Sequence, residues 1–480
     1  MVSKQAQAVV IGAGPGGYVA AIRLGQLGVK TIVVERVHLG GVCLNYGCIP
    51  SKALIHAAEV FHEISQVGEM GITVEGLALD MTKLRDWNAG IVEKLTSGIG
   101  ALLKANGVEV VMGEARVAGP GKVLVDTGNG APTEILTDNI IVATGARPIE
   151  IPGFTFDGER VLSSKHVFQL DEVPDRVLVI GGGYIGLELG TALRKLGSEV
   201  TVVEMMDRVL ATMEKDLTKV VERRLKKLGV QVRTKAKALG YAVTKKGLEA
   251  KIETADGEET ITVDRIVSAV GMRPNTEGLG LAEAGVEIDA RGFITVDAQR
   301  QTNVKGIYAI GDAAGGVLLA HKASKEGVVA AEAIAGKPAA YDVVAMPWVV
   351  FTDPEIAGVG FSQKEAKDAG YTVNVGKFQY SGSGRALTMD APEGFVKMVT
   401  CAETDLVLGI QMVGAHASEM LGEAALAIEM CATAQDISLT VHAHPTLPEM
   451  VMEAAEAVHG LAIHAAPPRK KAKSGSGARA

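Results

Sequence analysis

Two segments of the chain share one pattern of apolar and polar positions. The first begins with the apolar run Val9–Ile11, continues through a glycine-rich turn, and ends about twenty residues later in a second run, Thr31–Glu35. A short apolar run bounded by glycines predicts a buried strand, and the glycines predict a turn that opens a helix. The segment 177–204 repeats the same order. The pattern therefore predicts two strand-turn-helix-strand units.

The glycines of both turns follow the spacing GxGxxG in the same register. Each glycine of the first turn, and Glu35 at the end of its unit, has a counterpart 169 positions later: Gly12, Gly14 and Gly17 correspond to Gly181, Gly183 and Gly186, and Glu35 corresponds to Glu204. In such a unit the glycines form the turn, admit a pyrophosphate and allow close helix packing, while the carboxylate accepts hydrogen bonds from a ribose. One GxGxxG is weak support, but two in register predict two dinucleotides that exchange electrons.

The carboxylate of the second unit bears on which pyridine nucleotide binds there. Glu204 would repel a 2′-phosphate and would hydrogen-bond a free 2′-hydroxyl, which favours NAD over NADP. Arg208 lies four positions later and weakens this argument slightly.

The segment after Pro347 has a different pattern. Short apolar runs at 395–399 and 408–414 predict strands, and the apolar residues 415–431 predict a helix. Cys401 falls in the first of these runs and Cys431 ends the helical one, and we expect both side chains to pack in a core. This segment is therefore expected to be a third kind of domain.

Size and charge narrow the class of protein. A chain of 480 residues is expected to form two to four domains. Its formal charge of −8 argues against a nucleic-acid partner. The apolar residues 6–21 are interrupted by glycines, so we expect no signal peptide, and no run of about 18 apolar residues predicts a membrane span. A cytoplasmic protein is expected, with a disordered basic tail at 466–480. We expect this tail to be solvated, and the alternative is that it docks to an acidic partner.

Two of the four cysteines, Cys43 and Cys48, stand five positions apart soon after the first unit. Such a pair in a cysteine-poor protein is more often catalytic or metal-binding than structural. Residues five apart on a regular helix lie roughly 8 to 9 Å apart between Cα atoms, beyond the usual disulfide limit of about 7 Å. A bridge would therefore need a distorted turn, for which Gly47 supplies conformational freedom.

Six motifs in order make the chain resemble the flavin-dependent pyridine nucleotide-disulfide oxidoreductases over nearly its whole length. They are the GxGxxG at Gly12, the segment GGVCLNYGCIPSK at 40–52, Ala143-Thr144-Gly145, the GxGxxG at Gly181, the segment 307–312, and the segment 442–449, which reads HAHPTLPE. The resemblance implies an α/β fold with two Rossmann-like dinucleotide-binding domains, for FAD and NAD, and a C-terminal α+β dimerisation domain.

The domain boundaries expected from this resemblance follow the motifs. They are 1–147 for the first part of the FAD domain, 148–273 for the NAD domain, 274–346 for the second, central part of the FAD domain, and 347–465 for the dimerisation domain.

The resemblance also implies where the cofactors bind. On the FAD side we expect Gly12, Gly14, Gly17, Glu35, Gly41, Lys52, Ala115, Gly145, Asp312 and Ala320, and on the NAD side Gly181, Gly183, Tyr184, Gly186, Glu188, Glu204 and Gly271. Glu35 would contact the adenosine ribose and Asp312 the ribityl chain. Lys52 would lie near the flavin ring, paired with Glu188, and a helix beginning at Ala320 would point its N-terminus at the flavin. No metal is expected.

The activity implied is the oxidation of protein-bound dihydrolipoyl groups, carried by E2 cores of 2-oxoacid dehydrogenase complexes or by the H-protein of glycine cleavage. A dihydrolipoyl thiolate would attack Cys43, Cys48 would face the flavin, and hydride would pass to NAD⁺. A substrate thiol needs a base. His444, oriented by Glu449, is expected to serve the opposite subunit of a homodimer, with His442 as the competitor.

Some residues depart from the usual family pattern. Tyr46 stands where small aliphatic residues are common, Met272 replaces an arginine, for which Arg273 could substitute, and Tyr184 stands where many relatives carry an aliphatic residue. Tyr184 either gates the nicotinamide pocket or has only a packing role.

Two competing functions have recognisable signatures. A glutathione reductase should show basic residues around 204–208, and a mercuric reductase should end in a cysteine pair, which residues 432–480 lack. A flavoprotein scaffold would have no reason to retain both cysteines together with His444 and Glu449.

Overall fold

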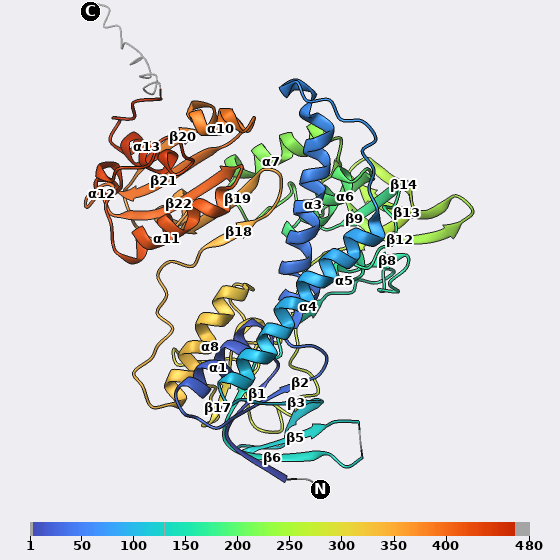
Figure 1. The fold of residues 1–480 in the computed structure, drawn as a ribbon, viewed down its shortest axis with the longest axis vertical. Helices are drawn as coiled ribbons and strands as arrows, with labels where there is room; N and C mark the ends of the chain where they lie inside the picture. The colour runs from blue at the N-terminus through green and yellow to red at the C-terminus, as the bar shows by residue number, and fades with distance from the viewer. Residues whose placement is uncertain (1–2, 129, 466–480) are drawn as a thin grey trace, which may run out of the picture. The chain divides into compact units, whose positions relative to one another are not determined.

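The computed structural model describes residues 3–128 and 130–465. The chain divides into two compact units, the first comprising residues up to 212 and 225–343, and the second comprising 213–224 and 344 onward. Figure 1 labels many of the helices and strands of both units. The tail expected at 466–480 lies outside the described residues. No helix within the described ranges combines the length and apolar character that a membrane crossing requires.

A seven-stranded sheet forms the centre of the first half of the first unit. Its strand order is β3-β2-β1-β6-β5-β4, and β17 pairs with β6 in parallel beyond the end of β5. These strands are β1 (Ser3–Ile11), β2 (Thr31–Glu35), β3 (Glu109–Met112), β4 (Glu114–Val117), β5 (Lys122–Asp126), β6 (Thr133–Val142) and β17 (Ile307–Ala309). The residues 307–309 thus return to the sheet begun by residues 3–11.

The central strand β1 is apolar at consecutive positions because both of its faces are covered. Val10 packs into one core with α1 (Pro15–Gln26), whereas Val9 and Ile11 pack into another with β4 and β5. The helix α8 (Ala320–Ile334) lies along α1 (Figure 1). Two longer helices, α3 (Cys48–Gln66) and α4 (Met81–Ala105), also belong to this unit.

The second Rossmann-type sheet repeats this topology. It has the order β11-β10-β9-β15-β8, and all of its strand pairs are parallel. Its strands are β8 (Val161–Leu162), β9 (Arg176–Ile180), β10 (Glu199–Val203), β11 (Gln231–Arg233) and β15 (Arg265–Ser268), with helices α5 (Ser164–Val167) and α6 (Tyr184–Lys195). In both sheets the strand before the glycine turn lies between the next strand of its own βαβ unit and a later strand.

Two small antiparallel sheets complete the first unit. One has three strands, β12 (Lys237–Thr244), β13 (Gly247–Thr254) and β14 (Gly257–Val263). The other pairs β7 (Ala146–Pro148) with β16 (Met272–Pro274), so that the chain entering the second Rossmann sheet and the chain leaving it lie together.

The second unit is built on an antiparallel sheet of order β18-β19-β22-β21-β20. Its strands are β18 (Trp348–Val350), β19 (Glu355–Gly360), β20 (Val373–Gln379), β21 (Phe395–Cys401) and β22 (Val407–Gly414), and its helices are α9 (Gln363–Asp368), α10 (Gly384–Thr388), α11 (Leu421–Glu429), α12 (Ala434–Leu439) and α13 (Glu449–Val458). The two strands expected from the apolar runs at 395–399 and 408–414 are confirmed as β21 and β22.

The prediction that both Cys401 and Cys431 pack in a core is wrong for Cys431. Cys401 is buried in β21, whereas Cys431 is exposed. The expected helix 415–431 is shorter at both ends: α11 spans Leu421–Glu429 after a 3₁₀ helix, η4 (Ala417–Met420), and the backbone of Cys431 has a φ of +53°. Cys431 therefore lies in the turn after the helix.

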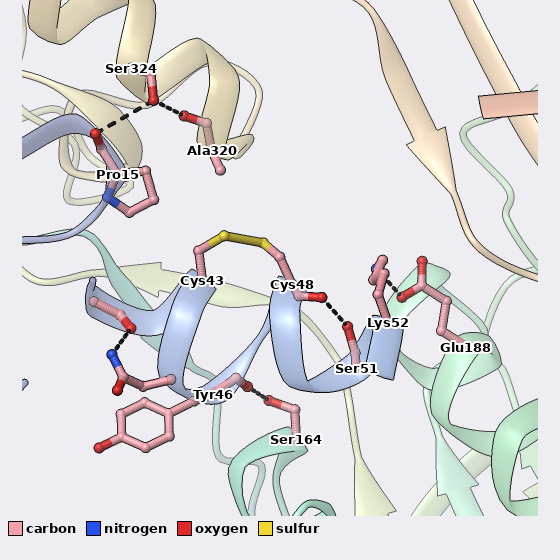
Figure 2. Close-up of a disulfide and its surroundings, with 12 residues drawn as sticks. Pro15, Cys43, Tyr46, Cys48, Ser51, Lys52, Ser164, Glu188, Ala320 and Ser324 are labelled. Carbon is pink, nitrogen blue, oxygen red and sulfur yellow. Dashed lines mark hydrogen bonds and ion pairs between the residues drawn. A yellow bond between two sulfur atoms is a disulfide. The ribbon is translucent and has the colours of Figure 1, made fainter. Parts of the chain in front are cut away.

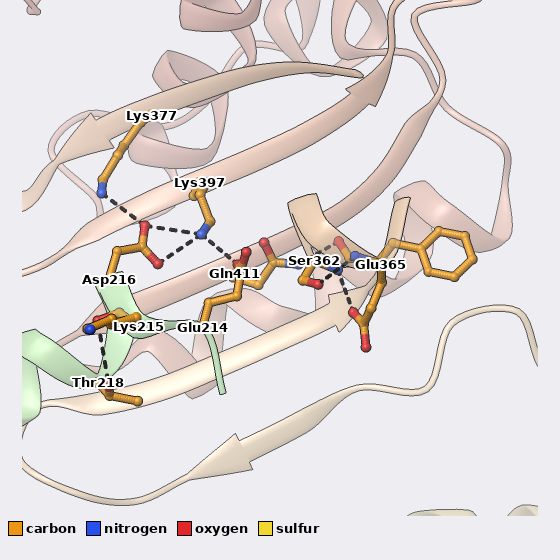
Figure 3. A network of polar contacts seen from close by, with 10 residues as sticks. Glu214, Lys215, Asp216, Thr218, Ser362, Glu365, Lys377, Lys397 and Gln411 are labelled. Carbon is orange, nitrogen blue, oxygen red and sulfur yellow. Dashed lines mark hydrogen bonds and ion pairs between the residues drawn. The ribbon is translucent and has the colours of Figure 1, made fainter. Parts of the chain in front are cut away.

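A cluster of charges around the buried Lys397 fixes the start of α7 (Lys215–Leu228) to the sheet of the second unit (Figure 3). Lys397 lies in the fully buried strand β21, and its Nζ donates to Glu214 Oε2 at 2.6 Å and to both oxygens of Asp216 at 3.0 and 3.1 Å. Lys377 on β20 donates to Asp216 at 3.3 Å. These contacts explain why residues 213–224 belong to the second unit.

Candidate functional site

Cys43 and Cys48 form a disulfide across a break between two helices (Figure 2). Cys43 lies in α2 (Gly41–Tyr46) and Cys48 is the first residue of α3. Gly47 separates the helices with a φ of −138° and a ψ of −108°, which is neither helical nor extended. This break brings the two Cα atoms to 4.7 Å, against roughly 8 to 9 Å on a regular helix. The distorted turn expected at Gly47 is confirmed.

The two sulfurs have different surroundings. Cys48 stands at the N-terminus of α3, which is 19 residues long, and the N-terminal end of a helix favours a negative charge. A thiolate formed at Cys48 on opening of the disulfide is therefore stabilised by the helix. Ser51 extends this first turn and donates to the Cys48 carbonyl at 3.1 Å.

Lys52 and Glu188 form the ion pair expected between them. Lys52 Nζ lies 2.8 Å from Glu188 Oε2, joining α3 to α6 one helical turn after Cys48 (Figure 2). Glu188 is almost fully buried, with a side-chain exposure of 5%, while Lys52 retains 33%. The pair thereby links the disulfide helix to the helix of the second fingerprint.

The two glycine fingerprints have matching geometry. A Cβ on Gly12 would lie 2.4 Å from the Ala143 carbonyl oxygen, and one on Gly181 would lie 2.4 Å from the Ala269 oxygen. A Cβ on the third glycine of either turn would meet the carbonyl of the first, at 1.9 Å for Gly17 and 2.1 Å for Gly186. The first and third glycines are therefore required by the fold itself.

The middle glycines differ, because they border open space. A Cβ on Gly183 would meet nothing within 4 Å, and one on Gly14 would meet only Gly41 Cα, at 3.8 Å. These residues cap α6 and α1 without a side-chain hydrogen bond, so each helix N-terminus is available to a phosphate. This arrangement fits the pyrophosphate of a dinucleotide at each turn.

The carboxylates of Glu35 and Glu204 accept the same kind of backbone hydrogen bonds. Glu35 accepts hydrogen bonds from the N–H groups of Ala13 and Val37, both at 2.8 Å. Glu204 accepts from the N–H groups of Gly182 and Met206, at 2.7 and 2.8 Å. Each carboxylate oxygen has a second lone pair for a ribose hydroxyl. Arg208 donates to the Ala211 carbonyl at 2.6 Å and contacts Asp207, so its guanidinium is engaged locally.

Asp312 lies in a short 3₁₀ helix, η2 (Gly311–Ala314), between β17 and α8. Burial raises the pKa of its carboxyl, an effect that Lys322 opposes and Glu326 reinforces. Ala320 begins α8 as expected, and Leu319 caps that helix without a side-chain hydrogen bond. A polar group and an open helix N-terminus thus follow β17 in succession.

The other predicted cofactor residues lie in turns, in strand β4 and at the start of helix α6. Gly41 approaches the first fingerprint so closely that a Cβ would lie 2.6 Å from Gly14 Cα. Gly145 and Gly271 flank the β7–β16 pair. Ala115 is buried in β4, where its side chain belongs to the core. Tyr184 is the first residue of α6 and is 42% exposed.

Tyr46, which departs from the family pattern, and Arg273, which follows Met272, have defined contacts. Lys165 lies over the ring of Tyr46 at 5.0 Å from its centroid, and the Ser164 hydroxyl donates to the Tyr46 carbonyl at 3.1 Å. Arg273 forms an ion pair with Glu277.

In the second unit, His444 is paired with Glu449 as expected. His444 Nδ1 lies 2.9 Å from Glu449 Oε1, and the Thr446 N–H donates to the other carboxylate oxygen at 2.8 Å. Burial acts to raise the pKa of Glu449, but the hydrogen bonds from Thr446 and His444 outweigh it and lower that pKa. Glu449 therefore stays ionised and holds the imidazole with Nε2 directed away. The His444 side chain is 78% exposed.

Both ring nitrogens of His442, the competing base, already have hydrogen-bond partners within the protein. Its Nδ1 lies 2.8 Å from the Thr440 carbonyl and its Nε2 lies 2.7 Å from Glu423, and the side chain is only 6% exposed. A base must offer a free ring nitrogen to the substrate. The geometry therefore favours His444.

Sequence reasoning missed three charged residues close to Asp312, namely Arg300, Lys322 and Glu326. Glu326 accepts a hydrogen bond from the Gly311 N–H at 2.7 Å. Lysine and glutamate four positions apart on a helix are usually solvated, so their spacing does not predict that Lys322 and Glu326 are buried.

Comparison with known proteins agrees with this arrangement. The chain matches the family described as pyridine nucleotide-disulphide oxidoreductase over residues 6–327 and its dimerisation domain over 346–455. A dihydrolipoyl dehydrogenase from Thermus scotoductus is 51% identical over 95% of this chain and 98% of its own length, and one from Bacillus subtilis is 49% identical over 95% and 97%.

Solved structures give the same result for the fold. The crystal structure of LpdA from Mycobacterium tuberculosis matches with a TM-score of 0.88 and 28% identity over 94% of this chain and 99% of its own. These matches confirm the α/β fold class and the resemblance expected from the six motifs. The chain belongs to the pyridine nucleotide-disulphide oxidoreductase family.

Proposed function

We propose that the chain is a dihydrolipoyl dehydrogenase, which oxidises protein-bound dihydrolipoyl groups to lipoyl groups with FAD and NAD⁺. The observation that carries this proposal is the Cys43–Cys48 disulfide, which stands at the start of a helix tied to the second dinucleotide fingerprint by Lys52 and Glu188. The names and the near-complete coverage of the most similar relatives support the same reaction.

The thiol chemistry proceeds by two exchanges. One dihydrolipoyl thiolate attacks Cys43 Sγ, the disulfide opens, and Cys48 leaves as a thiolate stabilised by the N-terminus of α3. The second dihydrolipoyl thiol loses its proton and attacks the mixed disulfide, which closes the lipoyl ring and releases Cys43. The substrate gives up two electrons and two protons, and the cysteine pair now holds the electrons.

FAD and NAD⁺ are the proposed cofactors. FAD, when bound, would supply the two-electron chemistry that links the cysteine pair to NAD⁺. The residues proposed to hold FAD are those of the first fingerprint, Glu35 and Asp312, and those proposed to hold NAD⁺ are the second fingerprint and Glu204. The carboxylate of Glu204 disfavours a 2′-phosphate, which supports NAD over NADP.

His444 is the proposed base for the substrate thiols. Its Nε2 takes a thiol proton, while ionised Glu449 stabilises the imidazolium through Nδ1. The dimerisation-domain match supports a homodimer. Four apolar residues of the second unit, Leu426, Met430, Leu439 and Val441, are 63 to 94% exposed in the single chain, which is consistent with their burial against a second copy. We propose that His444 of the partner subunit serves the disulfide of this one.

The proposed partners are proteins that carry a lipoyl arm. Lipoyl domains of an E2 core or the H-protein of glycine cleavage would present the same dithiol to this site. The unpaired Cys401 and Cys431 support a reducing compartment, and we place the enzyme in the cytoplasm.

One set of assays tests the proposed function. Purified protein is supplied with dihydrolipoamide and NAD⁺ or NADP⁺, and separately with oxidised glutathione and NADH or NADPH. We expect turnover of dihydrolipoamide with NAD⁺. Turnover confined to glutathione with NADPH would show instead a glutathione-reductase-like enzyme, and a flavoprotein with no turnover in either direction would indicate a scaffold subunit.

A further inference from the structure

A closed set of buried charges stands behind the 3₁₀ turn that carries Asp312. The side chains of Lys322 and Glu326, on the first two turns of α8, are 4% and 1% exposed, and that of Arg300, from the loop before β17, is 14% exposed. Charged side chains are rarely this deeply buried unless each is paired and hydrogen-bonded. Lys322 and Glu326 meet that condition, and Arg300 is paired through Nη1, while its buried Nε has no hydrogen-bond partner among the described residues.

Glu326 is bound at both carboxylate oxygens. Its Oε1 accepts from Arg300 at 2.9 Å, and its Oε2 accepts from the Gly311 N–H at 2.7 Å and lies 3.1 Å from Lys322 Nζ. The bond to Gly311 is the important one, because Gly311 is the first residue of the turn and immediately precedes Asp312. The carboxylate therefore fixes the turn at its beginning.

Lys322 fixes both ends of the same turn. Its ammonium donates to the Gly311 carbonyl at 3.0 Å and to the Gly315 carbonyl at 2.5 Å, and Glu326 takes the third direction. An ammonium has three N–H donors, so all three are used within the cluster. Charged groups of α8 thus bind three backbone groups around Asp312: the N–H and the carbonyl of Gly311 before it and the carbonyl of Gly315 after it.

The charges of the cluster also balance. Lys322 and Arg300 carry two positive charges, and Glu326 and Asp312 carry two negative charges when ionised. Arg300 is supported on its outer side by the ring of Tyr341, with its guanidinium carbon 4.7 Å from the ring centroid. Removal of one member leaves an uncompensated charge beside the backbone of the turn.

We propose that Glu326 and Lys322 are positioning residues for the flavin, which hold the Gly311–Gly315 backbone so that Asp312 meets the ribityl chain without rearrangement. Neither residue touches the cofactor in this role; both act through the turn. The inference rests on the proposed use of FAD and of Asp312. Preorganisation of a binding group raises affinity by removing the cost of ordering it on binding.

The test separates the two halves of FAD. Flavin is removed from the full-length dimer, and the affinity of the apoprotein for FAD is measured by the quenching of flavin fluorescence. ADP is then titrated as a competitor of FAD, which reports on the adenosine half at the first fingerprint alone. The variants are Glu326→Gln and Lys322→Met. The control is Glu332→Gln, which breaks the pair of Arg23 with Glu332 on the same helix α8, away from the turn.

We expect Glu326→Gln and Lys322→Met each to weaken FAD binding tenfold or more, with the competition constant of ADP unchanged within twofold. Glu332→Gln should change neither constant by more than twofold. If Glu326→Gln does not fold, Lys322→Met alone decides, because Arg300 and the Gly311 N–H still satisfy its Glu326. Equal weakening of FAD and ADP, or wild-type FAD affinity in folded variants, would overturn the inference. Failure of the wild-type apoprotein to bind FAD would instead overturn the proposed function.

Discussion

At the scale of single residues, the two histidines of the HAHP segment differ in what their ring nitrogens contact. His442 is buried between Thr440 and Glu423, whereas His444 is exposed and bound at Nδ1 by Glu449. The sequence of the segment alone hardly distinguishes which histidine is the base, because both are followed by small or turn-forming residues. The contacts of their ring nitrogens separate them, and such contacts depend on residues up to 19 positions away.

We predict that His444→Gln lowers kcat for dihydrolipoamide oxidation by about 10²- to 10⁴-fold, the usual contribution of a general base. Bound flavin and the thermal unfolding temperature should be unchanged, because the His444 side chain is exposed. Steady-state kinetics with NAD⁺ and a thermal melt measure both properties. His442→Gln is the control: it should lower stability and retain most of the turnover. Near-wild-type turnover by His444→Gln would contradict the assignment.

At the scale of elements, the glycines of the second fingerprint have separable tasks. Gly186 lies against the Gly181 carbonyl, so its missing Cβ allows α6 to approach the turn. Gly183 borders open space at the N-terminus of α6, so its missing Cβ leaves room for a ligand. The same residue type thus serves packing at one position and binding at the other.

We predict that alanine at position 183 weakens ligand binding, whereas alanine at position 186 lowers stability. Gly183→Ala should fold normally, retain flavin and weaken NAD⁺ binding about tenfold or more, because its methyl group enters the space for the pyrophosphate. Gly186→Ala should lower the free energy of unfolding by about 1–3 kcal/mol, the usual cost of overpacking. Calorimetric titration with NAD⁺ and urea denaturation distinguish the outcomes. Unchanged NAD⁺ affinity in Gly183→Ala would show that the dinucleotide does not lie against this turn.

At the scale of the whole molecule, the sequence predicted best what is local. The fingerprints, the strands at 395–399 and 408–414 and the break at Gly47 depend on neighbours within a few residues, and the structure contains them. The buried Lys397 was not predicted, because its partner Glu214 is 183 positions away and lysine is ordinarily solvated. Cys431 was placed wrongly for a related reason, since helical periodicity does not reveal where tertiary contacts end a helix.

The cluster around Lys397 predicts how stability responds to acid. Burial alone would raise the pKa of Asp216, but the charges of Lys397 and Lys377 outweigh burial and lower it. Burial also lowers the pKa of Lys377, an effect that Asp216 opposes. A carboxyl whose pKa is lowered by folding stabilises the native state above its unfolded pKa, and this contribution is lost as the pH falls through the folded pKa. Glu214, the remaining charged member, pairs with the same Lys397.

We therefore predict that Asp216→Asn destabilises the protein at pH 7 by about 1–2 kcal/mol, less than a fully buried pair because Asp216 is 40% exposed. The difference from wild type should shrink as the pH falls below about 4, the ordinary pKa of aspartate in the unfolded chain, because the lowered pKa keeps native Asp216 ionised until the pH is lower still. Urea denaturation at pH 7 and at about pH 3 measures both values. Asp368→Asn is the control, since it breaks an exposed pair with Lys364 in α9 and should change stability by less than about 0.5 kcal/mol. A pH-independent effect of Asp216→Asn would contradict the argument.

The proposed sharing of each active site between two subunits predicts complementation. Homodimers of Cys43→Ser lack the sulfur that substrate attacks, and homodimers of His444→Gln lack the base, so both should be nearly inactive. In a mixed dimer, one site combines both substitutions, whereas the other combines the intact disulfide of one subunit with His444 of the partner subunit. Random reassortment makes half of the dimers mixed, each with one working site, so about a quarter of wild-type activity should appear. Co-expression with two affinity tags isolates the mixed dimer, which should then show about half of wild-type turnover. If each site used the histidine of its own chain, both sites of the mixed dimer would carry one substitution, and its turnover would stay at the level of the parents.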